Sequence, residues 1–249
     1  MTFANTFAQG SDAYAAARPL YPQDLLDWIA SACRNHDAAW DCATGNGQAA
    51  VALARIFQRV EATDVSAAQV AEAFAAPNVR YSAQPAESTA FADRSFDLIT
   101  VAQALHWFDY ELFWPEVRRV ARPGALFCAW GYAWFRGDPD VENKLLGPVA
   151  KLVEPYWAAQ NRILWNSYRD ADTLCPFDRL EAPELRIVVD WSVDRIIAYV
   201  RTWSAYKRAA ADGLETQLEA TLAEARRRLD PDTSHQLWVP LAIRAGYVE

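Results

Sequence analysis

Short apolar runs alternate with amphipathic segments along the first half of the chain. The runs at residues 38–42 and 96–102 have the length of a strand, and residues 110–120 carry apolar side chains at helical spacing. Apolar runs of this kind are typical of parallel strands that are covered on both faces. The predicted strands are residues 38–42, 60–64, 78–82, 96–102, 125–131 and 185–191, with a seventh near 236–248, and the predicted helices are residues 22–34, 48–57, 66–75 (with Ser66 as N-cap) and 110–120. This alternation predicts an α/β fold with a parallel sheet.

The second half of the chain, from residue 132, departs from this alternation. Tryptophans such as Trp134, Trp157 and Trp203 are scattered there among proline-bounded and helical segments. Large aromatic side chains are usually core residues, because each of them buries about 150–250 Å². We expect long, mainly helical insertions in this half, which cap the carboxyl edge of the sheet.

A glycine-rich turn follows the first predicted strand. Gly45 and Gly47 lie between the run at 38–42 and an alanine-rich segment that begins at Gln48. Glycine lets the backbone approach a nucleotide closely, because it carries no side chain. Asp64 ends the next predicted strand, where a carboxylate can accept hydrogen bonds from both hydroxyls of a ribose. The pattern predicts a nucleotide-type cofactor at the carboxyl ends of these strands.

Asp41, which precedes the two glycines, helps to separate two kinds of cofactor. A carboxylate at this position would repel the pyrophosphate of a nicotinamide dinucleotide, whereas it suits a ligand that carries an ammonium group. The chain also lacks an obvious Tyr-x-x-x-Lys pair of the kind some oxidoreductases use. A nicotinamide-dependent oxidoreductase still shares the glycine-rich turn, so it stays an alternative at this point.

Six short motifs carry a resemblance to a known family. They are, in order, Tyr14-x-x-x-Arg18-Pro19-x-Tyr21-Pro22, Asp41-x-Ala43-x-Gly45-x-Gly47, Thr63-Asp64-Val65-Ser66, Ala86-Glu87, Ser95-Phe96-Asp97-Leu98-Ile99 and Ala104-Leu105-His106-Trp107-Phe108-Asp109. Their order and spacing resemble those of class I S-adenosylmethionine-dependent methyltransferases. Within that class, the chain is similar to the small-molecule group of trans-aconitate methyltransferase-like (type 11) proteins.

The resemblance implies a fold and a domain organisation. The fold is a Rossmann-like, seven-stranded, mostly parallel sheet flanked by helices, with a helical cap from insertions in the C-terminal half. Residues 1–249 then form a single methyltransferase domain. Within it, residues 1–37 are an N-terminal lid and the first helix, residues 38–131 are the cofactor-binding core, and residues 132–249 are the substrate cap and the last strands.

The resemblance also implies a function. A methyl group is transferred from S-adenosylmethionine, which leaves S-adenosylhomocysteine, to a small-molecule acceptor, for which a carboxylate is the favoured guess. The implied cofactor-binding residues are Tyr14, Arg18, Asp41, Ala43, Gly45, Gly47, Asp64, Val65, Ala86, Glu87, Ala102, Gln103 and Trp107. A methyltransferase-like protein that binds the cofactor without catalysis is a further alternative.

His106 is the predicted catalytic residue. Histidine is the usual general base near neutral pH, and this one follows the carboxyl end of the fourth predicted strand. The alternative is that its ring nitrogens bond to backbone groups. A carboxylate acceptor needs only positioning, since it is already a nucleophile at neutral pH, whereas a hydroxyl or an amine needs a base. The predicted substrate-side residues are Tyr132, Trp134, Trp203 and Tyr206, for which packing in the scaffold is an equally good explanation.

Charge and cysteine content narrow the range of partners. A net charge of −8 argues against a nucleic-acid partner, because binding to a phosphate backbone depends on clustered Lys and Arg. The four cysteines are far apart and lack the spacing of a metal site, so we expect free thiols and no metal. The sequence contains neither an apolar run of roughly 20 residues nor a signal peptide, so we expect a cytoplasmic protein without a membrane partner. The pattern does not indicate an oligomeric state.

Overall fold

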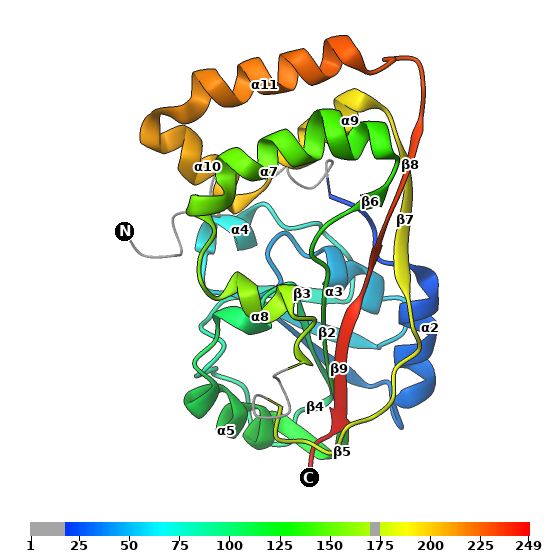
Figure 1. The fold of residues 1–249 in the computed structure, drawn as a ribbon. Helices are drawn as coiled ribbons and strands as arrows, with labels where there is room; N and C mark the ends of the chain where they lie inside the picture. Colours follow the sequence, from blue (N-terminus) through cyan, green and yellow to red (C-terminus); the bar gives the residue numbers. More distant parts are fainter. Residues whose placement is uncertain (1–17, 170–174) are drawn as a thin grey trace. The chain divides into compact units, whose positions relative to one another are not determined.

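A computed structural model describes residues 18–169 and 175–249 of the chain (Figure 1). Contacts between Cα atoms divide the chain into two compact units, and each is described by itself. The core unit comprises Tyr21–Tyr132, the described residues of 162–185 (162–169 and 175–185) and Pro240–Glu249. The tryptophan unit comprises, among the described residues, 18–20, Ala133–Asn161 and Arg186–Val239.

The core unit is built on a six-stranded sheet of order β3-β2-β1-β4-β5-β9. Its strands are β1 (Ala38–Cys42), β2 (Arg59–Asp64), β3 (Val79–Ala83), β4 (Phe96–Ala102), β5 (Ala121–Gly131) and β9 (Ala242–Tyr247). All neighbouring pairs from β3 to β5 are parallel, and β9 is antiparallel to β5. Cys42 of β1 lies opposite Thr63 of β2 and Val101 of β4, so the carboxyl ends of these strands meet at one edge. Open α/β sheets bind their ligands at this edge, where the strand order reverses between β1 and β4.

The apolar runs at β1 and β4 become the centre of this sheet because they are the most deeply buried. All five residues of β1 are buried, and Trp40 in its middle is fully inaccessible to solvent. The Trp40 ring lies 6.2 Å from the ring of Phe96 and 6.5 Å from that of Phe113 on α5 (Tyr110–Val120). An aromatic core of this kind holds the sheet against its helices.

The expected number of seven strands in this sheet is wrong, because the sheet has six. The last two predicted strands are placed differently. β7 (Arg186–Trp191) is a strand, but it belongs to a separate three-stranded sheet of order β6-β8-β7. The stretch near 236–248 forms two strands, β8 (His235–Pro240) and β9, and only β9 joins the large sheet. Exposed and buried residues alternate in β7, a pattern that suits a sheet with one solvated face.

The helices of the core unit follow the predicted pattern but two of them end early. They are α2 (Gln23–Ala32), α3 (Gln48–Leu53), α4 (Ala67–Ala71), α5 (Tyr110–Val120) and α8 (Asn161–Trp165), with a 3-10 turn η2 (Leu105–Trp107). Ser66 caps α4 as predicted, and its Oγ accepts a hydrogen bond from the Gln69 amide at 3.4 Å. α4 stops before residue 75 because the Phe74 amide donates to the carbonyl of Asn46, in the glycine-rich turn, at 3.0 Å. α3 stops before residue 57 because the chain tightens into turns, in which Ile56 and Phe57 both donate to the carbonyl of Leu53.

The tryptophan unit is largely helical, as expected, and it also contains the second sheet, which the sequence analysis does not predict. Its helices are α6 (Pro139–Val141), α7 (Gly147–Val153), α9 (Val193–Arg201), α10 (Ser204–Ala209) and α11 (Glu215–Arg228), with the shorter segments η3 (Glu142–Leu146), η4 (Glu154–Tyr156) and η6 (Ala210–Leu214). The second sheet consists of β6 (Arg136–Gly137), β7 and β8. Across the described residues of both units, no helix is long and apolar enough to cross a membrane.

Candidate functional site

The glycine-rich turn after β1 has the backbone conformation that its sequence predicts. Gly45 and Gly47 have φ values of 58° and 84°, in the left-handed region that glycine adopts without strain. A Cβ on Gly47 would lie 2.2 Å from the hydroxyl of Tyr81, which reaches over the turn from β3. Ala43, also a predicted cofactor residue, has a φ of 53°, which is rare outside glycine and occurs at functional sites. The turn therefore has no room for a side chain at Gly47.

Asp64 joins the turn to the end of β2. Its Oδ2 accepts a hydrogen bond from the Gly45 amide at 2.9 Å, and its Oδ1 accepts one from the Ser66 amide at 2.8 Å. The residue is half-buried, and burial raises the pKa of its carboxyl above the ordinary value against the effect of these two amides. Each carboxylate oxygen has a second lone pair available to a further donor.

Asp41 is fully buried, and both of its oxygens bond within the protein. The Thr44 hydroxyl donates to Oδ2 at 2.5 Å, and the Thr100 hydroxyl donates to Oδ1 at 2.8 Å. Burial raises the pKa of the Asp41 carboxyl to about 6, although the hydroxyl hydrogen bonds lower it. Asp41 thus ties the turn after β1 to the neighbouring strand β4.

Three further predicted cofactor residues lie after β2 and β3. Val65, next to Asp64, is 66% exposed, which is unusual for valine. Ala86 is buried on the loop after β3. Glu87 uses its Oε1 to accept a hydrogen bond from the amide of Asp109, the N-cap of α5, at 3.2 Å. The exposed side chain of Val65 forms an apolar surface beside Asp64, the carboxylate predicted to bind the ribose.

The carboxyl end of β4 is tied to the end of β5 by Gln103, which follows Ala102. The Gln103 side chain donates to the carbonyl of Tyr132 and accepts from the Tyr132 amide, both at 3.2 Å. Gln103 has a φ of 60°, so it is a second strained residue at this edge of the sheet. A Cβ on Gly131 would lie 3.0 Å from the Gln103 Oε1 and 3.1 Å from the Tyr168 hydroxyl.

His106 lies in the 3-10 turn that follows β4 and is 4% exposed. Its Nδ1 is 3.3 Å from the hydroxyl of Tyr168, and its ring centroid is 4.9 Å from that of Trp107. Burial lowers the pKa of the imidazole to about 4, so His106 is neutral at physiological pH. The alternative considered for His106, a bond from the ring to a backbone group, does not occur among the described residues, because the recorded partner is a side chain.

Sequence reasoning missed Tyr168 and Tyr81. Tyr168 lies 62 residues from His106 and reaches it from the loop after α8, and Tyr81 covers Gly47 from β3. Neither residue belongs to a matched motif, and no local pattern indicates such contacts. The left-handed φ of Tyr168, 53°, is a signal that only the structure provides.

The other predicted residues lie in the tryptophan unit or outside the described residues. Trp134 and Trp203 contact each other with ring centroids 5.3 Å apart, and Trp157 lies 5.3 Å from Trp134 and 6.0 Å from Trp203. Tyr206 donates a hydrogen bond to Glu219 on α11 at 2.6 Å. The Arg18 guanidinium lies 5.9 Å from the centroid of the Tyr199 ring. Tyr14 lies outside the described residues.

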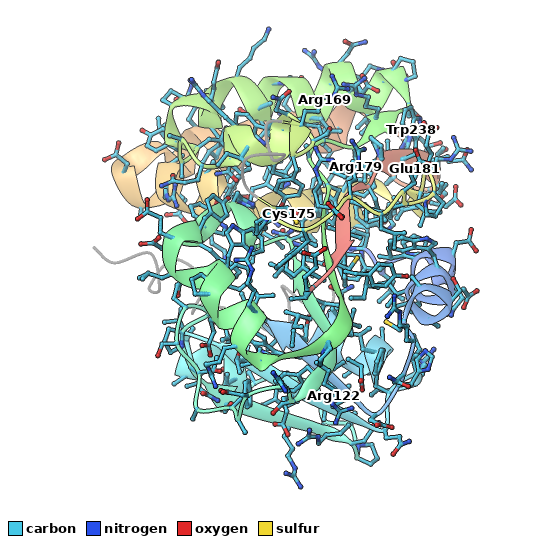
Figure 2. All side chains as sticks on the ribbon, turned by 90° about the horizontal axis from the view of Figure 1, so that it is seen from below. Arg122, Arg169, Cys175, Arg179, Glu181 and Trp238 are labelled. Carbon is cyan, nitrogen blue, oxygen red and sulfur yellow. The ribbon has the colours of Figure 1, made fainter. Side chains whose placement is uncertain are left out.

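Asp97, in another matched motif, has a structural role at the start of β4. It accepts hydrogen bonds from the amides of Asp37 and Ala38 and forms an ion pair with Arg122 at 2.9 Å. Figure 2 shows Arg122 far from Arg169 and Arg179, which belong to the same unit. This end of the sheet is opposite the edge that carries His106.

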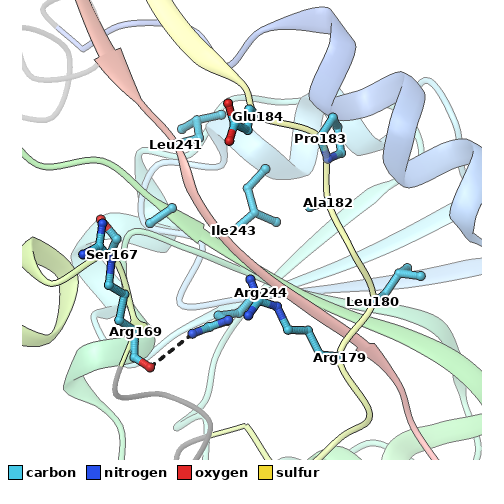
Figure 3. A pocket seen from close by; sticks show the side chains of 11 residues that line it. Ser167, Arg169, Arg179, Leu180, Ala182, Pro183, Glu184, Leu241, Ile243 and Arg244 are labelled. Carbon is cyan, nitrogen blue, oxygen red and sulfur yellow. Dashed lines mark hydrogen bonds between the residues drawn. The ribbon is translucent and has the colours of Figure 1, made fainter.

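A pocket of about 430 Å³ lies beside β9 in the core unit (Figure 3). It is lined by Ser167, Arg169, Arg179, Leu180, Ala182, Pro183, Glu184, Leu241, Ala242, Ile243 and Arg244. None of the predicted site residues lines it. Its link to the site is Arg244, which donates to the carbonyl of Tyr168. Within the described residues, no group of three or more His, Cys, Asp and Glu side chains could hold a metal ion.

Known proteins that are similar to this chain are methyltransferases. A family model described as a methyltransferase domain matches residues 40–129. A methyltransferase of Dictyostelium discoideum is 28% identical over 238 residues, which cover 93% of this chain and 90% of the relative. A methyltransferase of Mycobacterium tuberculosis is 30% identical over 174 residues, covering 66% of this chain and 71% of the relative.

A solved structure agrees with these sequence relatives. The structure of a type II methyltransferase from Anaeromyxobacter dehalogenans is 37% identical, has a TM-score of 0.82, and is matched over 93% of this chain and 98% of its own. These matches favour neither the oxidoreductase nor the non-catalytic alternative, and they leave the trans-aconitate subgroup as a prediction. The chain belongs to the class I S-adenosylmethionine-dependent methyltransferases, and S-adenosylmethionine is its cofactor.

Proposed function

We propose that this methyltransferase acts on a small-molecule acceptor and that the acceptor atom is a carboxylate oxygen. The observation that carries the proposal is His106, a buried imidazole with a pKa of about 4 at the carboxyl end of β4. A base is most effective when its pKa is near the working pH. An imidazole this weakly basic is poorly suited to remove a proton from an alcohol or an ammonium group. A carboxylate acceptor makes no such demand, because it is ionised at neutral pH.

The residues after β1 and β2 fit the cofactor. Gly45 and Gly47 leave the backbone of the turn without side chains, and a Cβ at Gly47 would clash with Tyr81. Asp64 is fixed by two amides and has lone pairs left for the two ribose hydroxyls. In this proposal Gly45 and Gly47 cradle the cofactor, with Ala43 beside them, and Asp64 holds its ribose.

The adenine and methionine parts of the cofactor are assigned to neighbouring residues. Val65, with its exposed side chain, packs on the adenine ring, and Ala86 and Glu87 bond to its edge. The methyl-bearing end lies toward Ala102, Gln103 and Trp107, beside the imidazole of His106. Asp41 serves this end by holding Thr44 and Thr100, since its carboxylate is fully buried and accepts from both of their hydroxyls.

Methyl transfer depends mainly on the alignment of the acceptor atom with the methyl group and the sulfur. S-adenosylmethionine supplies a methyl group on a sulfonium centre, which a nucleophile displaces in line. A rigid edge helps to align the acceptor, and the side chain of Gln103, bonded twice to Tyr132, provides that rigidity next to His106. His106 contributes a polar group without contributing charge, because its imidazole is neutral.

Two measurements test the proposal. Calorimetric titration is expected to show binding of S-adenosylmethionine and S-adenosylhomocysteine and no binding of NADH. Transfer of a radiolabelled methyl group is then measured with a panel of small di- and tricarboxylates and with alcohols and amines of matched carbon skeleton. We expect label in the carboxylates, released by mild base as expected for an ester. Label in the alcohols or amines alone would refute the carboxylate assignment and leave the cofactor assignment intact.

A further inference from the structure

We propose that Tyr168 sets the tautomer of His106, so that the imidazole presents its Nε2–H as a hydrogen-bond donor to the methyl acceptor. The inference rests on the proposed function for its last step, the contact with the acceptor. Its first step, the tautomer, concerns only the two side chains. Tyr168 is a positioning residue in this proposal, because it acts through His106.

The contact between the two side chains is enclosed in the core unit. Tyr168 is fully buried, His106 is 4% exposed, and the Tyr168 hydroxyl lies 3.3 Å from His106 Nδ1. A buried hydroxyl hydrogen needs an acceptor, since an unmade hydrogen bond is costly away from water. Among the described residues, His106 Nδ1 is the recorded hydrogen-bond partner of this hydroxyl. The nearby Gln103 Oε1 already accepts from the Tyr132 amide.

The direction of the hydrogen bond follows from the protonation states. Burial raises the pKa of the Tyr168 phenol well above its ordinary value, so the hydroxyl keeps its proton. Burial lowers the pKa of His106, so the imidazole is neutral and has one unprotonated nitrogen. An imidazole nitrogen is a better acceptor than a phenol oxygen, and the phenol is the better donor. The Tyr168 hydroxyl therefore donates to Nδ1, and the proton of the neutral ring resides on Nε2.

The backbone around Tyr168 is fixed in a way that aims its hydroxyl. Ser167 and Tyr168 have φ values of 55° and 53°, an unfavourable conformation that the surrounding structure must hold in place. The carbonyl of Tyr168 accepts two hydrogen bonds from Arg244 on β9, from Nε at 2.9 Å and Nη2 at 2.5 Å. Arg244 also donates to the carbonyl of Arg169 at 3.4 Å (Figure 3). Gly131 leaves space for the phenol, because a Cβ there would lie 3.1 Å from the hydroxyl.

The tautomer decides which acceptors the site favours. An Nε2–H donor stabilises an acceptor oxygen that is already anionic, and a carboxylate is such an oxygen. The same nitrogen has no lone pair to receive a proton, so it does not activate an alcohol or an amine. Tyr168 would thus select for carboxylates among acceptors of similar size.

The chain contains its own reference signals for a test by nuclear magnetic resonance. It has three histidines, at positions 36, 106 and 235. His36 Nε2 lies 3.0 Å from the carbonyl of Ala30, which can only accept, so His36 carries its proton on Nε2. His235 Nδ1 lies 2.6 Å from the Asp138 carboxylate, so His235 carries a proton on Nδ1. The set of histidine signals that disappears in the His106→Gln variant is the set that belongs to His106.

The experiment uses the full chain labelled with 15N-histidine, alone and with S-adenosylhomocysteine. We expect His106 to show a one-bond N–H coupling at Nε2 and none at Nδ1, as His36 does. Tyr168→Phe is expected to shift the population toward Nδ1–H, because the donor to Nδ1 is gone. Tyr247→Phe is the control, since the Tyr247 hydroxyl donates to the carbonyl of Ala32 in the same unit and its loss should leave the His106 signals unchanged.

The outcomes separate the tautomer from the proposed function. A proton on Nδ1 of His106 in the wild-type chain overturns the inference, whatever the variants do. A proton on Nε2 that persists unchanged in folded Tyr168→Phe overturns the role of Tyr168. Failure of all carboxylates to accept methyl groups refutes the proposed function alone, because the resonance signals do not depend on an acceptor.

Discussion

The carboxyl ends of β1 and β2 differ from the carboxyl end of β4 in how their polar groups are held. Asp64 accepts one of its two bonds from an amide two residues away and Asp41 one of its two from a hydroxyl three residues away, and the other bonds come from Gly45 and Thr100. At β4, Gln103 bonds to a residue 29 positions away and His106 to one 62 positions away. The first region is therefore organised partly by local bonds, whereas both bonds named in the second region join distant parts of the chain. Substitutions should act locally in the first and through distant packing in the second.

The largest effect is expected from Gly47→Ala in the locally built turn. The new Cβ would meet the Tyr81 hydroxyl at 2.2 Å, and alanine would be strained at a φ of 84°. Strain and overpacking together should lower the free energy of unfolding by about 3 kcal/mol. Gly45→Ala is the control, because its nearest atom would be 3.9 Å away and only the strain of about 1 kcal/mol applies. Urea unfolding compares the two, and equal losses would show that Tyr81 does not restrict the turn.

The two regions should also respond to pH in opposite directions. The pKa of His106 is about 4 in the folded chain, against an ordinary value of 6.5 that applies once the chain is unfolded. The unfolded chain then binds more protons between these values, so His106 costs stability as the pH falls from 6.5 to 4, by about 3 kcal/mol in total. For Asp41 the pKa is about 6 in the folded chain against an ordinary value of 3.8. Its contribution is thus lost as the pH rises from 3.8 to 6, again by about 3 kcal/mol.

The variants His106→Gln and Asp41→Asn isolate these contributions. Relative to wild type, His106→Gln should become more stable as the pH is lowered from 6.5 to 4. Asp41→Asn should become relatively more stable as the pH is raised from 4 to 6. Unfolding free energies measured from pH 4 to 6.5 give, for each variant, the slope of its stability relative to wild type against pH. Slopes of the same sign for the two variants would contradict the opposite pKa shifts of His106 and Asp41.

Asp64→Asn probes the locally built region through the cofactor. Loss of the charge should weaken S-adenosylhomocysteine binding by about 2 kcal/mol, roughly thirtyfold, since charge-assisted hydrogen bonds contribute on this scale. Asp230→Asn is the matched control, because Asp230 also accepts from an amide two residues on, in the tryptophan unit. Calorimetry measures the affinity of both variants for S-adenosylhomocysteine. An unchanged affinity for Asp64→Asn would exclude the ribose contact.

The smallest effect is expected from Gly131→Ala, in the region built by distant contacts. Its Cβ would lie 2.6 Å from Leu164 Cδ1, at the end of a flexible side chain, and 3.0 Å from Gln103 Oε1. The loss in unfolding free energy should be about 1–2 kcal/mol, because Leu164 can move. Combining Gly131→Ala with Leu164→Ala should cost less than the sum of the two single changes. Strict additivity in urea unfolding would show that Leu164 is not what opposes the new methyl group.

The same contrast explains how far the sequence predicts the structure. The strands from β1 to β5 lie close to the predicted ranges, and the apolar runs of β1 and β4 are buried, as in a sheet covered on both faces. β7 was expected in the large sheet and lies in another, since its own residues do not specify its neighbour. Asp41, Gly45, Gly47 and Asp64 come together as expected, because short turns connect them to two adjacent strands. Tyr168 and Tyr81 were missed because long-range packing brings them to the site, and no local pattern encodes it.

The cluster of Trp134, Trp157 and Trp203 gives the tryptophan unit an optical signature of its own. Indole rings at centroid distances of 5.3 to 6.0 Å couple their strong far-ultraviolet transitions and are expected to produce a split band in circular dichroism. The core unit has Trp40 and Trp130, which are fully buried and contribute to fluorescence from an apolar environment. Fluorescence sums over the eleven tryptophans of both units, so the split band is the signal that follows the tryptophan unit by itself, without any label.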